Sequence, residues 1–172
     1  MVRTSRRNVL KAVMSGGVVA GTAPLTAQHP QPSAAGSLAH ATVAFGQWNT
    51  PVDRFTGAFT PANIGHHIAP REVMIAAGGS VSFLIGGFHL LLIYNDGVQA
   101  GDINTSLFIP GPPVELIDDP NNRLYRGLDP RSNLLDRLEV VHFHNPGRYF
   151  VACGVLPHFK DGMWGFVRVV HG

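Results

Sequence analysis

Hydrophobic and polar residues alternate along short stretches of the chain after residue 40, with the period of two that predicts β-strands. Val81, Phe83 and Ile85 alternate with polar or smaller neighbours, for example, after a Gly-Gly pair at 78–79 that predicts a turn. Seven strands are expected in total, at residues 41–48, 72–77, 80–85, 87–94, 137–144, 148–153 and 163–170. This pattern predicts an all-β fold, an antiparallel sandwich of about seven or eight strands.

Two segments lack this alternation. Residues 99–135 carry repeated prolines and Asp/Asn pairs, and a segment of this length is long for a loop within a compact domain. Residues 28–40 are rich in Pro, Ser, Ala and Gly, which is typical of a linker. We therefore expect a domain at 41–172 with a long insertion at about 99–135.

The first 27 residues have the layout of an export signal. A basic start is followed by an apolar stretch of small residues and a plausible cleavage point after Ala27. The sequence SRRNVLK at 5–11 resembles the twin-arginine signal, which implies a bacterial protein exported to the periplasm in a folded state. The apolar part is too short and glycine-rich for a membrane span, so none is expected in the mature chain.

The signal also explains the basic character of the whole chain. Four of the 13 Lys and Arg residues, and none of the 11 Asp and Glu residues, lie in residues 1–27. The remainder has nine basic and eleven acidic residues, a formal net charge of −2. No basic patch remains that would favour a nucleic-acid partner.

The chain has one cysteine, Cys153, although an exported protein enters a compartment where cysteines usually pair. His158 follows at the fifth position after it and Met163 at the fifth position after that. A thiolate, an imidazole and a weak thioether, with a second imidazole, are the donors of a blue-copper site. His89 is the best candidate for the second imidazole, because it interrupts the apolar run GFHLLLIY at 87–94. Taken alone, His89 would more simply be a core histidine with a hydrogen-bond partner.

The sequence FHNPGRYFVACGVLPHFKDGMWGFVRV at 143–169 resembles the closing part of the cupredoxins, the small blue copper proteins. Its Cys-x4-His-x4-Met spacing is most similar to the auracyanin and rusticyanin type, and residues 72–94 resemble the strands that deliver the first histidine. The resemblance implies a Greek-key β-sandwich with one type 1 copper ion. The implied ligands are His89, Cys153, His158 and Met163. Many members have asparagine after the first histidine, which helps to hold the site around the sulfur. This chain has Leu90 there, so that only its backbone N–H can take that role.

The residues around the candidate site separate it from other copper proteins. Multicopper enzymes relay electrons through a histidine beside the cysteine, and here the neighbours are Ala152 and Gly154. A binuclear copper centre needs two cysteines. The pairs His142/His144 and His66/His67 are interpreted as surface histidines. Catalysis by a cysteine nucleophile paired with His158 is a further alternative, but it leaves Met163 unexplained.

The resemblance implies a monomeric periplasmic electron carrier, not an enzyme, that cycles between Cu(II) and Cu(I). A redox partner protein is expected to dock near His158, where Val155, Leu156, Pro157 and Phe159 would form an apolar patch. The alternative function is a copper carrier or storage protein without redox turnover. Only Met74 and Met163 lie beyond the signal, which is few methionines for that function.

Overall fold

A computed structural model of the chain describes residues 38–46 and 66–172. The predicted export signal and most of the predicted linker lie outside the described residues. The first strand includes residues 38–40, which the sequence pattern had assigned to the linker. Within the described part of the chain, no helix has the length and apolar character needed to cross a membrane.

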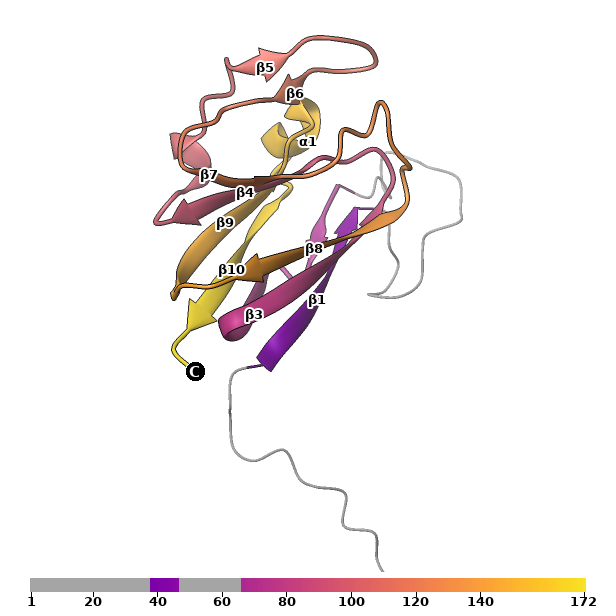
Figure 1. The fold of residues 1–172 in the computed structure, drawn as a ribbon. Coiled ribbons are helices and arrows are strands. Elements are labelled where there is room, and N and C mark those ends of the chain that lie inside the picture. The colour runs from indigo at the N-terminus through magenta and orange to yellow at the C-terminus, as the bar shows by residue number, and fades with distance from the viewer. Residues whose placement is uncertain (1–37, 47–65) are drawn as a thin grey trace, which may run out of the picture. The chain divides into compact units, whose positions relative to one another are not determined.

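The described residues form ten strands and two short helices (Figure 1). In chain order these are β1 (Leu38–Gly46), β2 (Ile68–Ala69), β3 (Glu72–Gly86), β4 (Leu91–Asp96), the 3₁₀ helix η1 (Ala100–Asp102), β5 (Phe108–Ile109), β6 (Leu116–Ile117), β7 (Arg123–Arg126), β8 (Arg137–Phe143), β9 (Gly147–Cys153), α1 (Leu156–Lys160) and β10 (Trp164–Val170). Seven strands pair in the order β2-β1-β3-β10-β9-β4-β7, β8 also pairs with β3, and β5 pairs only with β6. The all-β sandwich is confirmed.

β3 is a single strand of 15 residues that belongs to both layers of the sandwich. Residues 72–76 pair with β10, whereas residues 79–85 pair with β8 and residues 80–86 with β1, which also meets Ile75 through Leu38. The turn predicted at 78–79 is therefore wrong, because the glycines let one strand change layers. Gly78 has a φ of +82°, and a Cβ at Gly79 would strike the carbonyl oxygens of Ala39 and Ala76.

The predicted antiparallel arrangement is also incomplete, because β3 runs parallel to both β1 and β10. A parallel pair needs a connection of a dozen or more residues, and 25 residues separate β1 from β3 along the chain. The remaining pairs of the main sheet are antiparallel. The alternation of hydrophobic residues finds strands but does not give their relative direction.

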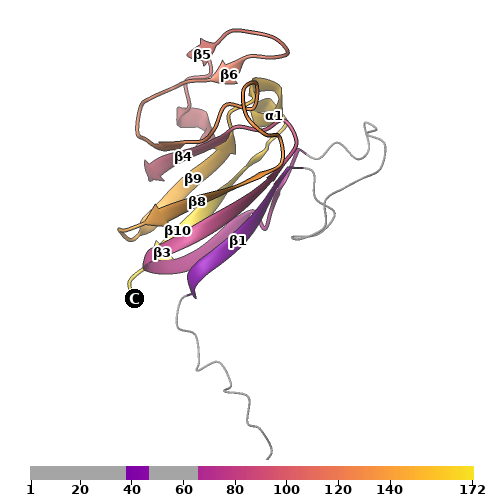
Figure 2. The same cartoon turned by 45° about the vertical axis from the view of Figure 1, so that its right-hand side comes forward.

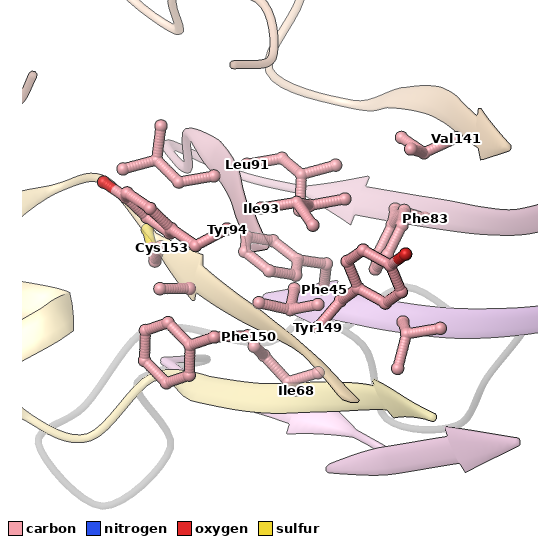
Figure 3. Close-up of a cluster of buried hydrophobic side chains, with 14 of the residues drawn as sticks. Phe45, Ile68, Phe83, Leu91, Ile93, Tyr94, Val141, Tyr149, Phe150 and Cys153 are labelled. Carbon is pink, nitrogen blue, oxygen red and sulfur yellow. The ribbon is translucent and has the colours of Figure 1, made fainter. Parts of the chain in front are cut away.

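The core lies between the two layers, and Figure 3 shows its aromatic and aliphatic side chains. Phe45 and Phe83 meet edge to face, with ring centroids 6.3 Å apart. Residues 90–94 are all fully buried, as their continuous apolar run predicted. Cys153 belongs to this core cluster (Figure 3).

The 99–135 insertion is ordered structure that includes η1, β5, β6 and β7. β7 pairs with β4 and so widens the main sheet by one strand. β5 and β6 lie at the same end of the molecule as α1 in both Figure 1 and Figure 2. Leu156 N donates to Glu115 O at 3.1 Å and Ile117 N donates to Gly154 O at 2.7 Å, so the insertion packs against the segment that follows β9.

Candidate metal centre

The strand register brings three of the four predicted ligands to one end of the sandwich. His89 lies between β3 and β4, Cys153 is the last residue of β9, and His158 lies in α1. β4 and β9 are antiparallel, with Leu91 opposite Cys153. His89, two residues before Leu91, therefore lies beside the end of β9.

Between the strands predicted at 148–153 and 163–170, the connection contains the short helix α1. Pro157 lies in the first turn, where its missing N–H costs no hydrogen bond. Met163 N donates to His158 O at 3.0 Å, and Cys153 N donates to Met163 O at 3.0 Å. These bonds close the segment on itself, so that the fully buried Met163 has its backbone tied to both Cys153 and His158.

Three donor atoms form a compact triangle. Cys153 Sγ lies 3.6 Å from His89 Nδ1 and 3.7 Å from His158 Nδ1, and the two nitrogens are 3.1 Å apart. A point equidistant from the three atoms lies about 2 Å from each, close to the distances at which metal ions bind imidazole and thiolate. The residues thus fit a metal ion, and two imidazoles with one thiolate are donors that suit copper.

Burial keeps the donors uncharged in the absence of a cation. It raises the pKa of the Cys153 thiol to about 12, although hydrogen bonds from the backbone at Val155 and Leu90 act in the opposite direction. It also lowers the pKa of His158 to about 4 and that of His89 well below its usual value, with neighbouring histidines contributing. A thiolate here therefore needs a bound cation, and the neutral imidazoles are ready to bind one.

Backbone N–H groups support the Cys153 sulfur, where many cupredoxins have an asparagine in place of Leu90. Leu90 is fully buried, its amide and that of Val155 lower the pKa of the thiol, and its carbonyl accepts a hydrogen bond from Gly154 N at 2.7 Å. A backbone N–H thus serves the sulfur here, as the sequence analysis had left open.

His89 is held on its other side by close packing. Its ring meets Phe45 edge to face at 6.0 Å, and a Cβ at Gly46 would overlap the ring. Among the described residues, none offers the buried His89 Nε2 a hydrogen-bond partner. With Nε2 facing apolar packing, Nδ1 is the atom that faces the sulfur.

His66 belongs to this site, which the sequence analysis did not predict. Its ring stacks on that of His158 with centroids 3.6 Å apart and an interplanar angle of 27°. His66 Nδ1 lies 3.4 Å from Asp161 Oδ2, beyond the C-terminal end of α1. The interpretation of His66 as a surface residue is therefore incomplete, because its side chain is only 23% exposed and packs on a predicted ligand, whereas His67, His142 and His144 are exposed.

The apolar patch predicted around His158 is smaller than expected. Val155 and Phe159 are buried and pack into the core, so they offer no surface. Pro157 is exposed and Leu156 is half-buried.

Comparisons with known proteins bear on the fold. No family model and no curated protein matches the sequence. Reduced auracyanin from Roseiflexus castenholzii is similar in structure, with a TM-score of 0.50, 20% identity, and 78% of this chain and 99% of that chain covered. Auracyanin B gives a TM-score of 0.45 at 20% identity, with 79% and 92% covered, and reduced rusticyanin gives 0.42 at 19% identity, with 79% and 81% covered. The chain therefore has the β-sandwich fold of the cupredoxins.

Proposed function

We propose that this protein binds one copper ion as a type 1 centre and transfers single electrons by Cu(II)/Cu(I) cycling. The ligands would be Cys153, His89 and His158, with the thioether of Met163 as a weaker fourth ligand. The triangle of Cys153 Sγ and the two Nδ1 atoms carries the proposal, because its size and donor types suit copper. The copper ion would supply the one-electron redox couple.

The protein's part is to keep the donors in one arrangement. His89 and Cys153 are almost completely buried, and Cys153 ends a paired strand, so neither side chain can move far without disturbing the packing around it. Burial also excludes water from the sulfur. Such a site suits electron transfer better than catalysis, because no histidine adjoins Cys153 to relay electrons to a second metal.

Export to the periplasm is part of the proposal, on the strength of the signal-like residues 1–27. A redox partner protein would dock beside α1, where Pro157 is exposed and the ring of His158 is only partly buried. The small apolar area there suits a weak, short-lived complex.

Adding Cu(II) to the purified protein tests the proposal. We expect an intense visible thiolate-to-copper band, an EPR spectrum with narrow hyperfine splitting, and reversible loss of both on one-electron reduction. The exposed His142 provides a control, since His142→Ala should leave both spectra unchanged. A colourless protein that binds only Cu(I) would contradict electron transfer and favour a copper carrier or store.

The stacked ring of His66 should help to hold His158 in place. His66→Ala is expected to weaken copper binding about two- to tenfold, because an aromatic pair of this kind contributes roughly 0.5–1.5 kcal/mol. His66→Phe keeps a stacking ring and should retain most of the affinity. Competition with a chelator of known copper affinity measures both, and equal losses in the two variants would show that the stack is not responsible.

A further inference from the structure

A buried ion pair lies beside His89, at the start of β8. Arg137 Nε donates to Glu139 Oε1 at 2.7 Å, and the two side chains are only 6% and 3% exposed. Removing two charges from water costs several kcal/mol per ion unless the remaining hydrogen-bonding groups are also satisfied. The partners of this pair therefore indicate what it does.

The guanidinium group of Arg137 connects three separate backbone segments. Its Nη2 donates to the carbonyl oxygen of His89 at 2.9 Å and to that of Leu128 at 3.1 Å. Its Nη1 donates to the carbonyl oxygen of Leu134 at 3.2 Å. A planar guanidinium group can bind several acceptors at fixed angles, which an ammonium group cannot reproduce.

Glu139 fixes the other side of the pair to the insertion. Tyr125 donates its hydroxyl to Glu139 Oε2 at 3.0 Å, and Leu128 N lies 3.4 Å from Oε1. A Cβ at Gly127 would overlap the Glu139 carboxylate, and Gly127 N donates to Leu91 O at 2.8 Å. The backbone of the insertion is thus pressed against both the ion pair and β4.

His89 needs such support because it lies in the short connection between β3 and β4, outside strand pairing. Its N–H donates across the turn to Gly87 O at 3.0 Å. Asp136, the residue immediately before β8, also helps to hold this connection, since its Oδ1 accepts a hydrogen bond from Gly87 N at 3.1 Å. A rotation of the His89 peptide would move the imidazole away from Cys153.

We propose that Arg137 and Glu139 are positioning residues that fix His89 by linking its carbonyl group to residues 125–134. The 99–135 insertion then has a function, which is to complete the support of the first imidazole. The effect on copper rests on the proposed function, whereas the link between Arg137 and His89 does not.

Arg137→Lys tests this, because it keeps the charge and loses the planar set of donors. In the metal-free protein we expect hydrogen exchange at the His89 and Gly127 amides to accelerate at least about tenfold, with little change in β1 and β10. Copper affinity should fall about 10- to 100-fold, with altered EPR hyperfine splitting. Arg148→Lys is the matched control, since Arg148 pairs with Glu72 at 2.8 Å on the surface, and it should change neither measurement.

Glu139→Gln provides a second variant of the same pair and should act in the same direction. Uniformly faster exchange throughout the sandwich, with unchanged copper affinity and EPR spectrum in the folded fraction, would overturn the proposal, because it would show a role in stability alone. Unchanged exchange at His89 and Gly127 would overturn it as well. If the unaltered protein shows no thiolate-to-copper band, the proposed function fails, and the exchange measurement still decides the positioning role.

Discussion

Cys153→Ser should abolish the visible colour of the Cu(II) protein and weaken copper binding by at least about 100-fold. The loss should exceed the 10- to 100-fold typical of residues that only support ligands, since Cys153 is proposed as a direct ligand. A serine hydroxyl holds its proton far more tightly than a thiol does, so the short, strong bond to sulfur is not replaced. Visible absorption and EPR, with copper affinity from chelator competition, measure the effect.

The buried position of Cys153 calls for a second variant in this test. Cys153 has no exposed surface, so burying the more polar serine hydroxyl, whose shorter C–O bond reaches the surrounding hydrogen-bonding groups less well, should destabilise the metal-free protein by about 1–3 kcal/mol. Cys153→Ala removes the sulfur without burying a polar group, so its metal-free form should be closer in stability to the original. Both variants should be colourless. Retained colour and affinity in either would refute the whole site assignment.

The features that the sequence predicts well are local ones. The spacing from Cys153 to His158 and Met163 falls within one connection, and alternation locates the flanking strands. His89 was recognisable because a histidine within an apolar run needs a partner. The structure does bring His89 and His158 to Cys153, although copper binding itself stays a prediction.

What the sequence did not predict depends on contacts between distant segments. His66 reaches His158 from 92 positions away along the chain, and no local pattern marks that approach. In the sequence, Arg137 and Glu139 look like ordinary polar residues at the start of a strand. The alternation of hydrophobic and polar residues cannot reveal that both side chains are buried, with Glu139 bonded to Tyr125 of the insertion. The double role of β3 was missed for a similar reason, since two adjacent glycines are as typical of a turn as of a bend between layers.

Gly46→Ala is expected to destabilise the metal-free protein by about 2–4 kcal/mol and to weaken copper binding. Gly46 ends β1 with a φ of +105°, a conformation that residues with a Cβ rarely adopt. The added Cβ would also strike the His89 ring and the carbonyl oxygen of Gly86, at 2.5 Å from that oxygen. Relief requires movement of backbone or of a proposed ligand, so stability and the metal site should suffer together.

Gly97→Ala separates the two causes. Gly97 follows β4 with a φ of +83°, but a Cβ there meets no atom within 4 Å among the described residues. This control variant should lower the free energy of unfolding of the metal-free protein by only about 1 kcal/mol, the usual strain of the left-handed conformation. It should leave copper binding unchanged. Urea denaturation of the metal-free proteins and chelator competition make the comparison. If Gly46→Ala were no worse than Gly97→Ala in either measurement, the packing of Gly46 against His89 would not be what holds the ring, and its orientation would have to depend mainly on the backbone fixed by Arg137.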